Sequence, residues 1–297
     1  MRTHLTLRRL AVVLAATACV GATTSCSGGD DSSSSGGSGA AASSSAEESG
    51  TYLALGDSVP FGFRGGEPDA YSDPESFIGY PDLVAEELDL ELINAACPGE
   101  TTTSFLDAKG QSNGCQRTLT SPFGYRTAYP VHVQYDSQDQ SQMNFAVQAL
   151  EENEDVELVT VQIGANDAFV CQQTTPDRCT TLASLQGVAQ TVKGNLERIL
   201  TTLRDDAGYD GQIVVVTYYA LNYSDATGAA TQLLGQQIAQ AAQAHDADVA
   251  DAFAAFRPVA EAAGGDSIAA GLVLPNDVHP TEQGQTLLAE AVLDVVE

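Results

Sequence analysis

Short apolar runs alternate with amphipathic stretches from about residue 51 to the end of the chain. The apolar runs are rich in Val, Ile, Leu and Tyr, which is typical of strands buried on both faces of a sheet. They predict strands at 52–55, 90–95, 156–163, 213–218 and 247–252. The amphipathic stretches predict helices at 81–88, 141–152, 182–203, 231–244 and 281–296.

Strands that alternate with helices predict βαβ units, and therefore an α/β fold with a mostly parallel five-stranded sheet and helices on both faces. The sequence shows no internal repeat. One segment, 107–140, lacks periodicity and is rich in Gly, Ser, Gln, Tyr and Pro. A loop of this length in a compact domain is usually functional or tied by a disulfide, and Cys115 lies within it.

The first 26 residues predict an export signal. Arg2, Arg8 and Arg9 precede an apolar run at 10–20 that is too short to span a bilayer. Small residues then lead to Cys26, which resembles a bacterial lipobox whose cysteine becomes lipidated, although Thr23 stands where Leu is usual. Ordinary signal cleavage that leaves Cys26 as a thiol is the alternative.

Residues 27–50 are almost entirely Ser, Gly, Ala and acidic residues, which predicts a flexible tether. We therefore expect residues 51–297 to form an exported domain that is lipid-anchored at the cell surface or secreted. The net charge of −28 would repel phosphate backbones, so we expect no nucleic-acid partner, and membrane contact through the lipid anchor alone. We expect a monomer.

Four of the six cysteines lie beyond the leader, an even number that predicts two disulfides in an exported chain. Three pairings are possible, and the short loops favour Cys97–Cys115 and Cys171–Cys179. No Cys-x-x-Cys pair occurs, so we expect no metal site and no cofactor.

Polar residues follow each predicted strand, at the edge of an α/β sheet where ligands bind. The first strand ends at Gly56-Asp57-Ser58, the second leads to Gly99 and the third leads to Asn166, while His279 precedes the last helix. These groups suit acyl transfer. Ser58 is a candidate nucleophile and His279 its base, and the N–H groups of Ser58 and Gly99 with the Asn166 amide could bind an oxyanion.

With these residues in this order, the chain resembles the SGNH, or GDSL, hydrolases, whose four blocks contribute Ser, Gly, Asn and His. The matching positions are Gly56-Asp57-Ser58, Gly99, Gly164-x-Asn166-Asp167 and His279-Pro280. The resemblance covers essentially the whole domain and is strongest to exported actinobacterial members. It implies a flavodoxin-like three-layer α/β/α fold and hydrolysis of carboxylic esters.

The last block departs from the family pattern. The family usually has Asp three residues before the histidine, and here that position is Asn276, with Asp277 next to it. The Asn276 amide, the Asn276 backbone carbonyl or Asp277 could orient His279. We favour Asn276, by side chain or carbonyl, and Asp277→Ala should then leave most of the activity.

The sequence leaves the ester open: a lipid or an acylated glycan are both candidate substrates. The first hypothesis is an esterase or lipase, the second a carbohydrate acetyl-esterase, and the third a non-catalytic surface protein that kept the fold and binds a glycan. Residues 110–114 fit the G-x-S-x-G pattern, but no predicted strand precedes them, so we interpret them as a polar loop. Tyr218 and Tyr219 could line the cleft or pack in the core.

Overall fold

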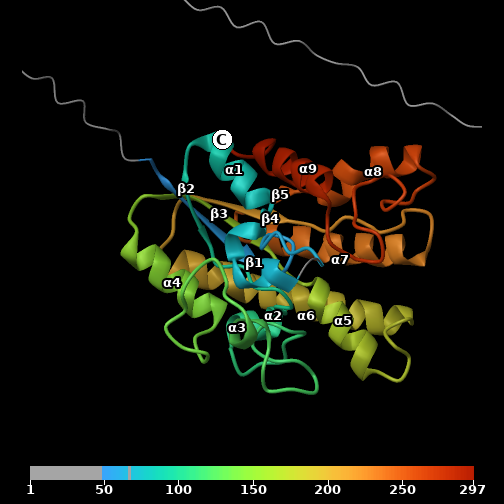
Figure 1. The fold of residues 1–297 in the computed structure, drawn as a ribbon, viewed down its shortest axis with the longest axis horizontal. Coiled ribbons are helices and arrows are strands. Elements are labelled where there is room, and N and C mark those ends of the chain that lie inside the picture. The colour runs from blue at the N-terminus through green and yellow to red at the C-terminus, as the bar shows by residue number, and fades with distance from the viewer. Residues whose placement is uncertain (1–48, 66–67) are drawn as a thin grey trace, which may run out of the picture. The chain divides into compact units, whose positions relative to one another are not determined.

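Five parallel strands form the centre of the molecule (Figure 1). The computed structural model describes residues 49–65 and 68–297, so the predicted leader, Cys26 and nearly all of the tether lie outside the described residues. The sheet has the order β2-β1-β3-β4-β5. Its strands are β1 Thr51–Gly56, β2 Glu91–Asn94, β3 Val156–Gln162, β4 Gln212–Val216 and β5 Asp248–Ala250.

The central strands are buried because both faces of the sheet are covered. All six residues of β1 and the last five of β3 are buried, which explains their nearly continuous apolar sequences. Chain order reverses between β1 and β3, so the connections leave β1 and β3 in opposite directions. In open α/β sheets this switch point, at the carboxyl ends of the strands, is where ligands bind.

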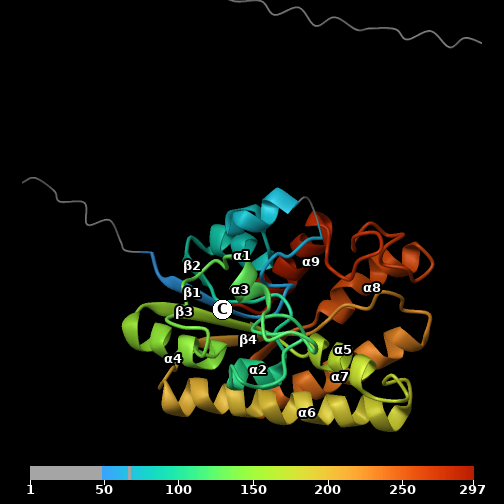
Figure 2. The same cartoon turned by 60° about the horizontal axis from the view of Figure 1, so that its bottom comes forward.

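Helices form a layer on each face of the sheet, and the predicted three-layer α/β/α fold is confirmed (Figure 2). One layer holds α1 Tyr80–Leu88, α8 Ala252–Ala262 and α9 Glu282–Leu293. The other holds α4 Gln142–Glu152, α6 Leu182–Thr201 and α7 Ala226–Gln243. Side chains of Ser141, Thr181, Asp225 and Thr281 accept backbone N–H bonds at the starts of α4, α6, α7 and α9.

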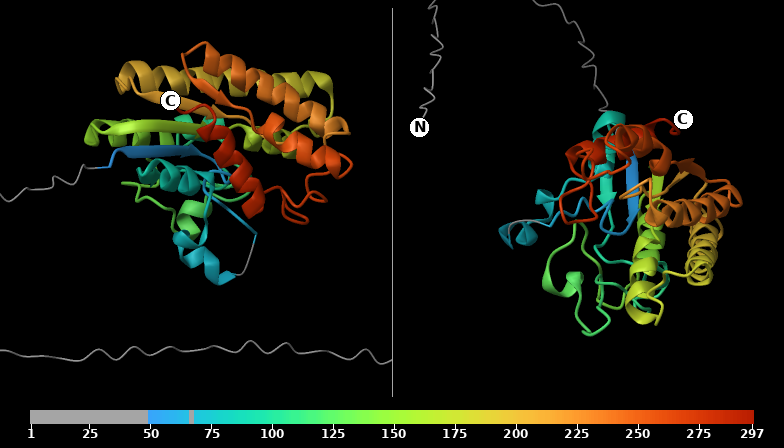
Figure 3. Two further views of the ribbon diagram at one scale, coloured as in Figure 1. Left: turned by 90° about the horizontal axis from the view of Figure 1, so that it is seen from above. Right: turned by 90° about the vertical axis from the view of Figure 1, so that its right-hand side faces the viewer.

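Several helices were not predicted from the sequence. The longest is α8, which begins at the last residue of the strand predicted at 247–252. The others are α2 Thr102–Leu106, α3 Tyr125–Ala128, α5 Ala165–Thr174, the 3-10 turns η1 Pro68–Ser72 and η2 Pro74–Ser76, and the π-helical turn η3 Thr202–Asp206 that extends α6. The turns η1 and η2 lie beside α3, outside the sheet (Figure 3). Aromatic rings join them there: Tyr71 contacts both Tyr125 and Tyr129.

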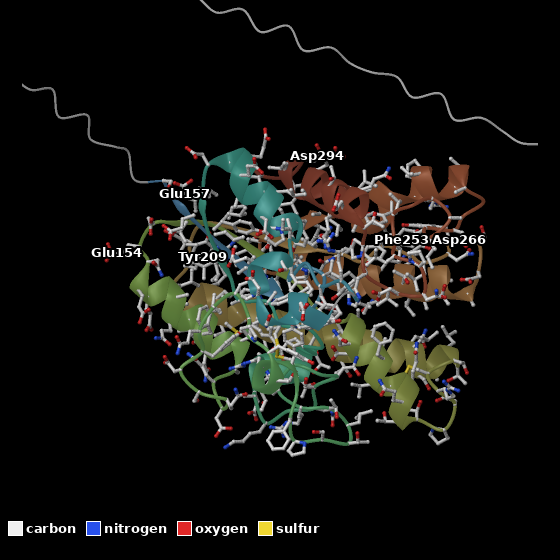
Figure 4. The ribbon with its side chains drawn as sticks, viewed as in Figure 1. Glu154, Glu157, Tyr209, Phe253, Asp266 and Asp294 are labelled. Atoms are coloured by element: carbon white, nitrogen blue, oxygen red, sulfur yellow. A yellow bond between two sulfur atoms is a disulfide. The ribbon has the colours of Figure 1, made fainter. Side chains whose placement is uncertain are left out.

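Both disulfides that the short loops favoured are present, Cys97–Cys115 and Cys171–Cys179. The first ties the start of segment 107–140 to the exit of β2. In Figure 4, Glu157 marks the amino edge of the sheet and Phe253, just beyond β5, marks the carboxyl edge. None of the described helices combines the length and hydropathy that crossing a membrane requires.

Candidate active site

Ser58 lies immediately beyond the carboxyl end of β1 and is half-buried. The turn that presents it depends on Gly56, whose φ is +142°. A Cβ atom at Gly56 would lie 2.1 Å from the carbonyl oxygen of Gln162, so only glycine fits against β3 there. Buried Gln142 on α4 fixes the same residue, because its side-chain amide accepts from Gly56 N and donates to Gly56 O. The sheet therefore holds the hydroxyl at the switch point.

His279 reaches Ser58 from the opposite end of the chain. Its Nε2 lies 2.9 Å from Ser58 Oγ. The loop that carries it returns on itself, with a bridge between Val273 and Pro280, and leads directly into α9. Tyr219 lies just beyond β4. Its hydroxyl donates to the carbonyl of Val278 at 2.6 Å and so holds the loop that carries His279. Serine and histidine are thus within hydrogen-bond distance, as nucleophile and base must be.

Asp277, rather than Asn276, contacts the histidine. Asp277 Oδ1 lies 2.6 Å from His279 Nδ1, which corrects our preference for Asn276 as the neighbour of the imidazole. The reason is a turn at 274–277, in which Asp277 N donates to Leu274 O. Pro275 precedes Asn276, whose φ is +59°, as a type II turn requires. The turn leaves Asn276 exposed at its corner and brings Asp277 to the ring.

Burial and charge act in opposite directions on this pair. Burial lowers the pKa of His279, and the Asp277 carboxylate only partly offsets this, so the imidazole stays neutral at neutral pH. Burial raises the pKa of Asp277. Attraction to His279 when its ring is protonated, the hydrogen bond from that ring and backbone N–H bonds from Val278 and Gly65 outweigh that effect, so the pKa of Asp277 lies below its usual value. A neutral ring beside an ionised carboxylate is suited to accept a proton through Nε2.

Gly99 and Asn166 lie near Ser58 on the wall of one pocket, together with His279. Asn166 is buried in the first turn of α5, and Gly99 follows β2 with a φ of +83°. Nδ2 of Asn166 is 3.4 Å from Oδ2 of Asp57, so its N–H groups face the serine turn. The four residues that the sequence analysis singled out at strand ends thus meet at one edge of the sheet.

Two pockets meet at this edge. The first, of about 740 Å³, lies between α5, α6 and α7, and Leu185, Val188 and Leu234 line it along with Tyr218 and Tyr219. The second, of about 490 Å³, lies toward segment 107–140 and is bounded by Phe63, Phe123, Tyr125 and Tyr129. Ser58, Asn166, Phe169, Val278 and His279 line both pockets. A bound ester could place its two halves on opposite sides of the hydroxyl.

Asp57, beneath the serine, was not predicted to belong to the site. Asp57 is fully buried and accepts from the Tyr218 hydroxyl at 2.5 Å, from Val59 N and from the Asn166 amide. Burial raises the pKa of Asp57 to about 6, and these hydrogen bonds limit the rise. The sequence held a signal for this contact. A buried acid needs hydrogen-bond donors, and Tyr218, which follows β4, is one.

A second buried carboxyl group lies next to Gly99. Glu100 accepts from Ser104, from Gln116 at 3.1 Å and from Gln142 at 3.3 Å, and burial raises its pKa to about 7. Glu100 also lies close to Cys97 and Cys115, and among the described residues these three side chains are near enough together to hold a metal ion. Their two sulfur atoms are bonded to each other, so they offer no thiolate ligands.

Comparisons with known proteins identify the family of this chain. Residues 54–287 match the model of the GDSL-like lipase/acylhydrolase family. The search of curated proteins found no match.

Two solved structures with TM-scores above 0.5 share the fold, and a third is reported beside them as a similar structure. A phospholipase A1 from Streptomyces albidoflavus is 22% identical with a TM-score of 0.53, and the match covers 84% of this chain and 100% of that one. A lipase from a goat rumen metagenome is 17% identical with a TM-score of 0.53, over 83% and 97%. An acetylxylan esterase from Geobacillus stearothermophilus is 18% identical with a TM-score of 0.47, over 82% and 93%. Because the family model matches most of the chain, this protein is a member of the GDSL-like lipase/acylhydrolase family, and it is an ester hydrolase.

Proposed function

We propose that the protein hydrolyses carboxylic esters through an acyl-enzyme on Ser58. His279 takes the hydroxyl proton at Nε2 as Ser58 Oγ attacks the ester carbonyl, and Asp277 accepts the Nδ1–H and stabilises the imidazolium. The N–H groups of Ser58 and Gly99 and the Asn166 amide bind the oxyanion. The imidazolium then protonates the leaving alcohol, and a water activated by His279 releases the acid.

The observation that carries this proposal is the hydrogen-bonded series from Ser58 to His279 to Asp277, with separations of 2.9 and 2.6 Å. A serine hydroxyl is a weak nucleophile without a base, and an imidazole needs its other nitrogen held to present the correct tautomer. Both requirements are met at the carboxyl edge of the sheet. Because Asp277 contacts His279, the replacement at Asn276 no longer favours a non-catalytic binding protein.

An apolar acyl group is the better candidate substrate. The larger pocket is lined by aliphatic side chains of α6 and α7, and burying a methylene there contributes roughly 0.8 kcal/mol. A carbohydrate acetyl-esterase is the second candidate. It is favoured by the second pocket, where Phe63, Tyr125 and Tyr129 could hold a larger alcohol while the acyl group stays short.

The decisive test is hydrolysis of p-nitrophenyl esters from acetyl to dodecanoyl by the wild type and Ser58→Ala. We expect kcat/KM to rise with chain length, and the variant to be inactive and unlabelled by a fluorophosphonate probe. A maximum at acetyl would favour the second candidate. Retained turnover by Ser58→Ala would refute the nucleophile.

We also propose that residues 1–26 direct export, that Cys26 is lipidated and that residues up to 50 tether the domain 51–297. Two disulfides in the described domain support an oxidising compartment. In a bacterial host, Cys26→Ser should move the protein from the membrane fraction to the soluble fraction. An unchanged distribution would contradict lipidation and leave signal cleavage as the alternative.

A further inference from the structure

Segment 112–115, which overlaps the G-x-S-x-G pattern at 110–114, packs against Gly99. A Cβ atom at Gly99 would lie 2.6 Å from Gly114 Cα, so the two backbones touch. Asn113 N donates to Gly99 O at 2.9 Å, and Ser112 Oγ donates to the same oxygen at 3.2 Å. The disulfide Cys97–Cys115 closes the contact on its other side. The carbonyl of Gly99, the residue whose N–H is the first remote oxyanion donor, is therefore held by this loop.

Ser112 holds the loop in shape. Its side chain is fully buried, and its hydroxyl oxygen accepts from the backbone N–H groups of Gly114 at 3.1 Å and Cys115 at 2.8 Å. A hydroxyl that accepts two bonds and donates one has no capacity left for nucleophilic chemistry in place. The serine of the G-x-S-x-G pattern is thus a support of the loop.

Asn113 reaches the second remote donor. Its Nδ2 donates to Oδ1 of Asn166 at 2.8 Å, and its own Oδ1 accepts from Nε2 of Gln173 at 2.9 Å. Gln173 Nε2 also donates to the carbonyl of Phe169, one turn earlier in α5. The orientation of the Gln173 amide therefore determines that of the Asn113 amide, which in turn determines that of the Asn166 amide.

The amide of Asn166 has one favourable orientation in this setting. With Oδ1 toward Asn113, its Nδ2 faces Asp57 and the serine turn. A flipped amide would put N–H groups against the N–H groups of Asn113, and its oxygen against the Asp57 carboxylate. It would also present an oxygen to the oxyanion, which repels where the N–H attracts.

We propose that Asn113 is a positioning residue of the oxyanion hole, holding the Asn166 amide with its N–H groups toward the reacting carbonyl while Ser112 holds Gly99. This inference rests on the proposed function, because it assigns a partner to a proposed oxyanion donor. It gives the long loop 107–140 a role in catalysis, with no contact between Asn113 and the substrate required.

The test is a double-mutant cycle on a short p-nitrophenyl ester with Asn113→Ala, Asn166→Ala and the double variant. Removing the donor itself should lower kcat roughly 10²- to 10³-fold. Asn113→Ala should lower kcat about tenfold or more with KM within about twofold, and should add nothing in the Asn166→Ala background. The control is Asn144→Ala, which removes an exposed side-chain amide on α4, with wild-type kcat expected.

The isosteric variant Asn113→Asp keeps the size and shape of the side chain and replaces its N–H donor with an acceptor. Its carboxylate accepts hydrogen bonds only, so it should turn the Asn166 N–H groups away from the oxyanion and lower kcat as far as Asn166→Ala does. Wild-type kcat in Asn113→Asp, or effects of Asn113→Ala and Asn166→Ala that multiply in the double variant, would overturn the inference. A wild-type kcat in Asn166→Ala would instead remove the proposed oxyanion role of Asn166 itself.

Discussion

Replacing Asp277 with alanine should abolish most of the activity, and the loss can be estimated from the site. The carboxylate lies 2.6 Å from His279 Nδ1, and the two side chains are 21% and 13% exposed. A charge pair of this kind near a protein surface is worth up to about 4 kcal/mol when the ring is protonated. Partial exposure reduces that figure, so we expect kcat/KM to fall roughly 10²- to 10³-fold.

The pH profile separates loss of the charge from loss of the fold. Activity requires neutral His279, so kcat/KM rises with pH through the pKa of this histidine. Asp277 raises that pKa against the effect of burial, and removing Asp277 should shift the rise to lower pH. The variant should therefore be less active, and its acid limb should lie at lower pH than in the wild type.

Asn276→Gly is the matched control, because it deletes the neighbouring side chain and still permits a φ of +59°. We expect it to retain activity within about twofold. Steady-state kinetics between pH 4 and 9, with circular dichroism as a check of folding, measure all three proteins. If folded Asp277→Ala lost less than tenfold while Asn276→Gly lost more, the assignment of the orienting residue would be wrong.

Three further outcomes follow. Ala230 lines the larger pocket from α7, so Ala230→Phe should lower kcat/KM for decanoyl esters about tenfold and spare acetyl esters, whereas Phe at exposed Ala229 should change neither. Burial raises the pKa of Glu100 to about 7, so stability should fall as pH rises from about 4.5 to 7; Glu100→Gln should reduce that slope in urea unfolding, with the raised pKa of Asp57 leaving part of it, and an unchanged slope would contradict this. Opening Cys171–Cys179 by serine substitution should lower the free energy of unfolding by about 2.5 kcal/mol, and equal denaturation midpoints would contradict this.

The layers and the sheet could be predicted because apolar runs report burial directly. The predicted strand at 156–163 and the observed β3 Val156–Gln162 differ by one residue. Short helices were missed for a physical reason: α2 Thr102–Leu106 and α5 Ala165–Thr174 are too short or too evenly polar to produce a clear helical period. They are held by caps and packing, which depend on residues far away in the sequence.

The candidate site was predictable where a side chain follows a strand. Ser58, Gly99 and Asn166 fall at the same edge because parallel strands end there, whatever the details of the loops. The side chain next to the imidazole was not predicted correctly, because it depends on one turn. The pair Pro275-Asn276 is the sequence signal of a type II turn, which places Asn276 at the exposed corner and Asp277 against the ring. This turn favours Asp277 over the residue at the family's usual spacing.

The parts of the proposed reaction rest on different supports. The nucleophile follows β1 of the sheet, and the base and its acid belong to the hairpin-like loop before α9. Of the remote oxyanion donors, Gly99 lies in a loop tied by Cys97–Cys115 and Asn166 in the first turn of α5. A change in the loop before α9 should therefore alter the pH profile, whereas a change near Asn113 should alter kcat at every pH. Because Ser112 and the disulfide hold Gly99, Asn113 holds Asn166, and Asp277 acts on the base, the two effects should multiply when combined. Activity of the combination Asp277→Ala with Asn113→Ala that equals that of either single variant would mean that the loops act as one unit.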